Sequence, residues 1–159
     1  MLKDLWDLPL STESPRAAEQ YILAVEKLLS ANVGAEEALG RSIDADPGFA
    51  LAHAARARVL QLRGAMPEAR AAAARAVLLA PSATRRERGH VEALALNLES
   101  DMPRTLAHVL EHLREFPRDG LVLSLTSGVF GLIGFSGRLD RNEALLDLLD
   151  GLAVSYGED

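Results

Sequence analysis

The sequence contains no cysteine and few aromatic residues. The absence of cysteine excludes disulfide bonds, thiolate metal sites and cysteine nucleophiles. Basic residues are also in the minority, since the chain has 17 Lys and Arg against 23 Asp and Glu, a net charge of −6. Nucleic-acid phosphates favour a basic surface, so we predict no nucleic-acid partner.

Long hydrophobic runs are missing as well. The longest apolar stretch, residues 121–135, is shorter than a membrane-spanning helix and contains three glycines. The first residues carry acidic side chains and lack the apolar centre of a secretory signal. We therefore expect a cytoplasmic protein without a membrane partner.

Proline recurs at a nearly constant interval among segments rich in alanine and leucine. Pro47 and Pro81 lie 34 residues apart, and Pro117 follows 36 residues later. Each proline comes at the end of an apolar segment with helical spacing, and it ends such a helix because it cannot donate the next backbone hydrogen bond. A period of this length is typical of stacked helix pairs.

Residues 50–83 fit the pattern of a tetratricopeptide repeat (TPR) most closely. Small residues, a turn glycine and a final proline stand at the positions where that repeat needs them: Ala57, Gly64, Ala69, Ala76 and Pro81. His53 replaces the usual aromatic residue, and Ala73 replaces a large apolar one. The sequence predicts an all-α fold, a TPR-like α-solenoid of about four antiparallel helix pairs. It spans residues 14–159 as a complete solenoid or the first part of a longer one, after an extended segment at residues 1–13.

The spacing also predicts where the helix pairs lie. We expect the first pair at residues 15–29 and 35–44, the second within residues 50–83, the third within residues 86–117, and the fourth at residues 121–135 and 142–156. Ser100-Asp101 stands in place of the turn glycine of the third pair. In the fourth pair glycine recurs at positions 128, 131, 134 and 137. Each glycine inside a helix costs about 1 kcal/mol relative to alanine, so we expect a neighbouring helix to approach closely. Asp140 with Glu143 resembles a capping box.

Several segments together resemble a known family. They are Leu8-Pro-Leu-Ser-Thr12, Ala45-Asp-Pro-Gly-Phe-Ala-Leu-Ala-His-Ala54, Thr84-Arg-Arg-Glu-Arg-Gly-His-Val-Glu-Ala93, Met102-Pro103 and Phe116-Pro-Arg-Asp119. In this order they are similar to the amino-terminal part of the tetratricopeptide repeat protein 38 family, over about residues 8–135. Members of that family are much longer than this chain. The resemblance implies a helical-repeat fold and brings no catalytic motif with it.

The first helix of each pair forms the concave wall of a TPR-like superhelix, and we expect that wall to bind a peptide or protein segment. The polar residues expected on the wall are Arg58, Gln61, Glu87, His90 and Asn97, with leucines at positions 51, 62, 94 and 98 among them. This mixture suits an amphipathic peptide better than a purely acidic tail. The sequence thus favours a protein–protein interaction module or scaffold, and we predict neither enzyme activity nor a cofactor.

An alternative is a small-molecule or metal-binding protein, or an enzyme. It would use His53, His90 and the basic cluster Arg85–Arg88. The same cluster is also explained as a charged helix start that pairs with neighbouring acidic residues. A third hypothesis is self-association through the last helix pair, because its apolar character leaves an uncapped end of the solenoid exposed.

His108-Val-Leu-Glu-His112 matches the H-x-x-E-H pattern of some zinc peptidases. Two histidines four residues apart share one face of a helix, as a zinc site requires. The apolar stripe of this helix, however, comprises Leu106, Val109, Leu110, Leu113 and Phe116. His108, Glu111 and His112 therefore fall on the opposite face, which we interpret as solvated or as lying between repeats, and we predict no metal site.

Overall fold

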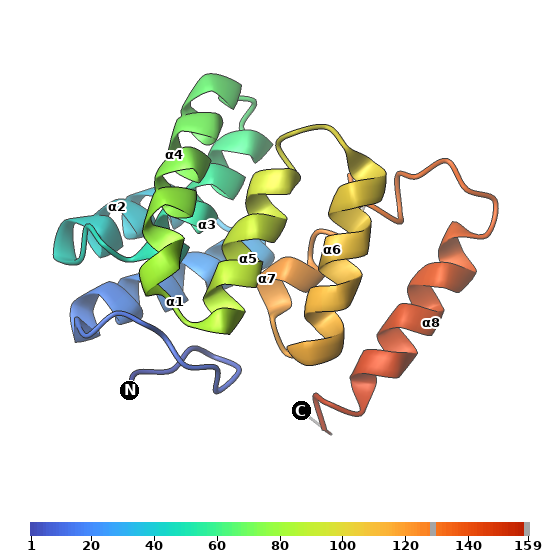
Figure 1. The fold of residues 1–159 in the computed structure, drawn as a ribbon, viewed down its shortest axis with the longest axis horizontal. Coiled ribbons are helices and arrows are strands. Elements are labelled where there is room, and N and C mark those ends of the chain that lie inside the picture. The colour runs from blue at the N-terminus through green and yellow to red at the C-terminus, as the bar shows by residue number, and fades with distance from the viewer. Residues whose placement is uncertain (128–129, 158–159) are drawn as a thin grey trace. The chain divides into compact units, whose positions relative to one another are not determined.

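The computed structural model describes residues 1–127 and 130–157. In these residues the regular structure is helical, with eight α-helices, one short 3-10 helix and no strand beyond a single bridge (Figure 1). The all-α class predicted from the sequence is confirmed. The chain divides into two compact units, Met1–Ser100 and Asp101–Asp159. The sequence does not predict this boundary, because helical spacing continues on both sides of it.

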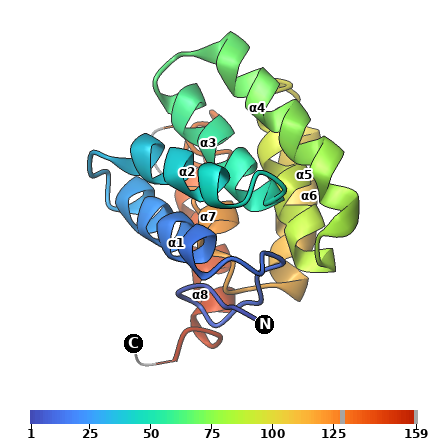
Figure 2. The same cartoon turned by 90° about the vertical axis from the view of Figure 1, so that its left-hand side faces the viewer.

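The first unit consists of two helical hairpins and a fifth helix. Its helices are α1 (Pro15–Leu29), α2 (Ala35–Ala45), α3 (Ala50–Leu62), α4 (Met66–Leu79) and α5 (Arg85–Leu96), with the 3-10 turn η1 (Ala80–Ser82) between the last two. Helix α1 packs on α2 and α3 packs on α4, while α3 also contacts α2 and α5. Figure 2 shows α1, α2 and α3 side by side.

Alanine makes the close packing of these helices possible. Ala57, Ala69 and Ala76, the small residues predicted at helix contacts, are fully buried. Ala57 and Ala69 belong to one hydrophobic cluster together with Leu60 and Leu98. Small side chains let two helix backbones approach, so these alanines gain their contacts from proximity. Larger buried side chains, among them Phe49, Leu39 and Leu51, complete the core of this unit.

The predicted helix ends of the first unit are confirmed. The hydroxyl of Ser14 caps α1 by accepting a hydrogen bond from the backbone N–H of Ala17, at 3.2 Å. Gly64 follows α3 with a φ of +79°, which lets the N–H of Ala65 reach back to the carbonyl of Leu60 at 2.9 Å. Pro47 and Pro81 lie outside the α-helices, in the loop after α2 and in η1.

The N-terminal segment, residues 1–13, is not extended as expected. It doubles back, with the N–H of Asp4 bonded to the carbonyl of Leu8 at 2.9 Å and the N–H of Leu10 to the carbonyl of Leu2 at 2.8 Å. One carboxylate oxygen of Asp4 accepts the N–H groups of Trp6 and Leu8, each at 3.0 Å. An aspartate that bonds the backbone two residues on is a turn former, and this effect outweighs the extended preference of Leu8-Pro9.

The second unit contains α6 (Met102–Glu115), α7 (Gly120–Leu123) and α8 (Arg141–Ala153). The helix expected at residues 121–135 is wrong, since α7 ends at Leu123 and turns follow. At Gly131 an added Cβ would lie 2.2 Å from the carbonyl oxygen of Ser127, so the chain passes itself too closely there for any side chain. The recurring glycines thus favour a tight loop over a helix, although Gly128 lies outside the described residues.

The expected capping box of the last helix is also wrong. Asp140 occupies the position before α8 but makes no side-chain capping bond. Its carboxylate instead accepts a hydrogen bond from Nε of Arg138 at 2.8 Å. A guanidinium two residues away offers a charged donor, which competes successfully with a backbone N–H. None of the helices in the described part of the chain has the length and apolar character that a membrane crossing requires.

Candidate functional site

The five polar residues predicted for a binding wall fall into two environments. Arg58 and Gln61 on α3 and Asn97, which directly follows α5, are half-buried. Glu87 and His90 on α5 are 0% exposed. Glu87 and His90 are therefore wrong as partner contacts, because a partner segment can bind only what reaches the surface.

Arg58, Gln61 and Asn97 form one hydrogen-bonded network. Nη1 of Arg58 donates to Oε1 of Gln61 at 2.7 Å, and Nδ2 of Asn97 donates to the same oxygen at 3.0 Å. Nε2 of Gln61 donates to the backbone carbonyl of Asn97 at 3.1 Å. The carboxamide of Gln61 is held at both ends, so its orientation is fixed. The structure brings these three predicted residues together at the contact between α3 and α5.

Arg58 is the charged member of this network. Burial lowers the pKa of its guanidinium, which nevertheless stays protonated because arginine titrates far above neutral pH. Its hydrogen-bond partner among the described residues is the neutral amide of Gln61. A partly desolvated cation bonded to a neutral amide still favours a further acceptor, and an incoming carbonyl or carboxylate oxygen supplies one.

An apolar groove adjoins this network on α3. It encloses about 510 Å³ between the end of α1, the loop that follows it and the end of α3. Its apolar lining includes Leu28, Val33, Val59 and Leu62, and its charged lining includes Lys27, Glu36, Glu37 and Arg63. Val59 directly follows Arg58, and Leu62, which is 52% exposed, directly follows Gln61. The last two turns of α3 thus present a polar face to α5 and an adjoining apolar face to the groove.

The N-terminal segment explains why Glu87 is buried. One carboxylate oxygen of Glu87 accepts the N–H of Ser11 at 2.9 Å, and the other accepts the N–H of Thr84 at 2.8 Å. The hydroxyl of Thr84 in turn accepts the N–H of Glu87, which completes a capping box at the start of α5. Thr84 three residues before Glu87 is the sequence pattern of a capping box, so this box is predictable. The bond from Ser11 is not, because Ser11 lies far away in the sequence.

Within the basic cluster Arg85–Arg88, Arg86 has a structural role. Arg86 is buried, its Nη2 donates to the carbonyl of Pro9 at 2.9 Å, and the same atom lies 3.5 Å from a carboxylate oxygen of Asp4. The expected pairing with a neighbouring acidic residue is therefore confirmed for Arg86. Arg88 is exposed, and its Nη1 donates to the carbonyl of Ala83 at 2.8 Å.

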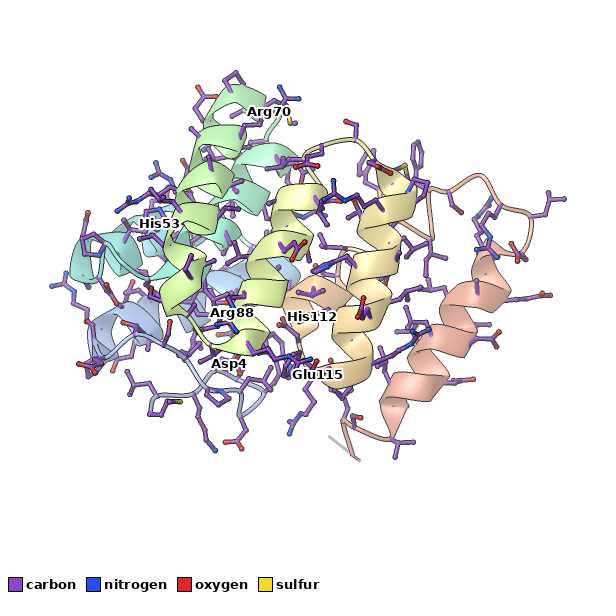
Figure 3. All side chains as sticks on the ribbon, viewed as in Figure 1. Asp4, His53, Arg70, Arg88, His112 and Glu115 are labelled. Atoms are coloured by element: carbon purple, nitrogen blue, oxygen red, sulfur yellow. The ribbon has the colours of Figure 1, made fainter. Side chains whose placement is uncertain are left out.

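The alternative hypothesis of a ligand or metal site requires His53 to lie near the cluster Arg85–Arg88. His53, seen on α3 in Figure 3, is half-buried with Nε2 3.1 Å from the carbonyl oxygen of Pro47. Burial lowers the pKa of its imidazole, and the nearby charges of Arg75 and Arg56 act in the same direction. These neighbours do not belong to the cluster Arg85–Arg88, so the contacts of His53 give no support to a joint site.

The second unit holds a buried histidine that the sequence places wrongly. His112 on α6 is buried rather than solvated, and its Nε2 lies 3.0 Å from a carboxylate oxygen of Asp119 (Figure 3). The turn after α6 brings Asp119 back against the helix, and helical spacing alone does not show that approach. His108 is half-buried and Glu111 exposed. Among the described residues no three metal-ligating side chains gather in a group that could hold a metal ion.

Comparisons with protein-family models, with curated proteins and with solved structures give no significant match to this chain.

Proposed function

We propose that the chain is a protein–protein interaction module, a TPR-like helical repeat that binds an amphipathic peptide or protein segment. The paired helices α1–α2 and α3–α4, with α5 packed on α3, agree with such a repeat. The likeness of the sequence to the tetratricopeptide repeat protein 38 family favours the same arrangement. The proposal involves no catalytic step and no cofactor.

One observation supports this function most strongly. The end of α3 carries the Arg58–Gln61–Asn97 network on one face and the groove at Val59 and Leu62 on the next. An extended or helical segment that crosses this edge meets hydrogen-bonding groups on one side and apolar walls on the other. We expect it to place a main-chain or carboxylate oxygen at Arg58 and an apolar side chain at Leu62.

The test selects binders from a peptide library displayed against the whole chain and then measures their affinity by calorimetry. Arg58→Ala removes a charge-assisted hydrogen bond worth about 1.5–3 kcal/mol, so we expect affinity to fall roughly 10- to 100-fold. Leu62→Ser should weaken the same peptides by removing the apolar wall of the groove. Arg16→Ala is the matched control, because Arg16 is an exposed arginine on α1.

Three results would contradict the proposal. The first is a library that yields no binder to the wild-type chain. The second is a set of binders that lose no affinity in either Arg58→Ala or Leu62→Ser, provided that far-ultraviolet dichroism shows both variants folded. A loss that is equal in Arg16→Ala would likewise remove α3 as the binding edge.

A further inference from the structure

The loop between α7 and α8 presents two aromatic rings to solvent. Phe130 and Phe135 are 78% and 61% exposed, and their ring centroids lie 6.0 Å apart. The residues between them point the other way, since Leu132 and Ile133 are buried. Exposed apolar patches of this kind commonly mark an interaction site.

Backbone hydrogen bonds hold the turn that carries the two rings. The N–H of Leu132 donates to the carbonyl of Leu125 at 2.8 Å, and the N–H of Phe135 donates to the carbonyl of Gly131 at 2.8 Å. The burial of Leu132 and Ile133 anchors the same turn. The backbone that carries the two rings is therefore held in this turn.

The same unit contains a groove that is open to an apolar group. It encloses about 460 Å³ between α6 and α8. Its lining is apolar apart from the polar side chains of Arg114, Asp147 and Ser155, and includes Leu110, Leu113, Pro117, Leu148, Gly151 and Leu152. A Cβ added at Gly151 would meet no atom within 4 Å, so this part of α8 has unfilled space beside it.

We propose that the protein forms a two-fold symmetric dimer in which the aromatic pair of each copy, Phe130 and Phe135, enters the α6–α8 groove of the other copy. A two-fold interface requires a surface that is complementary to itself, and this unit carries both a protruding apolar loop and a recessed apolar groove.

The loop and the groove each have one positive and one negative side chain beside them, so their charges can also be complementary. The ion pair of Arg138 and Asp140, about half exposed, follows the aromatic loop, and the two charged residues of the groove are Arg114 and Asp147. Docking of the loop would bring Arg138 and Asp140 of one copy near Asp147 and Arg114 of the other copy. Such an arrangement favours a single orientation of the two copies.

The area that docking would bury is sufficient for a specific contact. A phenylalanine buries about 150–250 Å² when enclosed, so four partly exposed rings in a dimer would cover on the order of 400–600 Å². An equal area on the groove walls brings the total to about 1,000 Å², the lower limit for a specific interface. We therefore expect a weak, concentration-dependent dimer.

A lipid surface is the less favoured occupant of the aromatic loop. The chain carries a net charge of −6, and Asp140, Asp147 and Asp150 lie on or beside α8. These carboxylates repel the anionic lipids that hold most peripheral proteins at a membrane. The groove of a second copy offers the cation Arg114 as well as the anion Asp147, so it suits the loop better.

Light scattering after size-exclusion chromatography over a concentration series tests the dimer. We expect the mass of the wild-type chain to rise from 17.1 kDa toward twice that value. Phe135→Ser removes half of the aromatic pair, and Gly151→Leu fills the groove, so both variants should remain monomeric. Gly151→Leu also replaces a helix-interior glycine by a better helix former, so loss of folding does not explain its effect.

Two controls make the result specific. Leu78→Ser removes a side chain of α4 that is 70% exposed, and it should dimerise like the wild type. An equimolar mixture of Phe135→Ser and Gly151→Leu retains one intact loop and one intact groove, so it should regain part of the association. A wild-type chain that stays monomeric throughout the series overturns the proposal. Equal loss of dimer in Leu78→Ser, or a monomer that binds neutral phosphatidylcholine vesicles through Phe135, overturns it as well.

Discussion

Buried ionisable side chains in this protein connect segments of one unit to each other. Glu87 receives the backbone of Ser11 and Thr84, and His112 lies against Asp119 with both side chains buried. Removing one member of such a pair leaves the other buried without its partner, at a cost of about 3–5 kcal/mol for a charged group. These residues therefore act on stability, whereas the half-buried Arg58 has one neutral partner among the described residues and is the one we propose for binding.

His53 should make the stability of the first unit sensitive to acid. Burial lowers the pKa of the folded imidazole below 6.5, so the unfolded chain binds protons more readily. The contribution of the neutral imidazole to the free energy of unfolding is complete above about pH 6.5. It is lost as the pH falls through the lower pKa of the folded state. We expect the free energy of unfolding in urea to fall between about pH 7 and pH 5, and His53→Gln to reduce that fall.

His108→Gln is the control, because it removes a half-buried histidine of the other unit. If wild type and His53→Gln lose stability in parallel as the solution is acidified, His53 does not contribute to the acid sensitivity.

Repeat spacing predicted the candidate site only in part. Arg58, Gln61 and Asn97 were placed on one surface because equivalent positions of successive repeats lie side by side, and the structure joins them by hydrogen bonds. The same spacing failed for Glu87, which receives its bond from Ser11, 76 residues earlier. Local periodicity contains no information on such a long-range contact, so burial by the N-terminal segment could not be foreseen.

At the scale of the helices, the ends of helices are predicted best by residues with restricted or unusual backbone conformations. Pro15, Gly64 and Pro81 mark ends that the structure reproduces, because each acts on its own backbone whatever surrounds it. Ser100 has a φ of +63° in the turn after α5, where the sequence has serine in place of glycine. The glycine-rich segment after α7 does not form the helix that its spacing predicts. Whether glycines are tolerated inside a helix depends on the neighbouring helices, which the sequence does not identify.

Gly40 and Gly64 allow two properties of glycine to be tested separately, its freedom to adopt a positive φ and its lack of a side chain. Neither Gly40 inside α2 nor Gly64 after α3 has an atom within 4 Å of an added Cβ, but only Gly64 has a positive φ, +79°. We expect Gly40→Ala to stabilise the chain by up to about 1 kcal/mol, and Gly64→Ala to destabilise it by about 1–2 kcal/mol.

Urea unfolding of the two alanine variants beside wild type measures both changes. Shifts of the same sign would show that the left-handed turn after α3 is not what Gly64 provides.

At the scale of the whole molecule, the N-terminal segment is an integral part of the first unit. Leu10 is 1% exposed, Thr12 donates to the carboxylate of Asp46 at 2.5 Å, and Arg86 and Glu87 bind the backbone between Pro9 and Ser11. Composition and helical spacing predicted the all-α class correctly. They gave no indication that these first residues complete the unit, because the segment has no helical spacing.

Leu10→Ala should loosen this attachment and destabilise the first unit by about 2–5 kcal/mol, the usual range for a buried leucine. Leu5→Ala is the matched control, since Leu5 lies in the same segment but is 51% exposed, and its change should stay within about 0.5 kcal/mol. Thermal unfolding compares the two variants. Similar losses in both would mean that the segment is not anchored through Leu10.

The turn of the N-terminal segment also carries Trp6, half-buried and the single tryptophan of the chain. Its indole is therefore a built-in optical reporter for this one segment. Detachment of residues 1–13 would transfer the indole to water and move its fluorescence emission to longer wavelengths, even while the helices keep their dichroism. Stopped-flow fluorimetry can thus follow that single event without any dye.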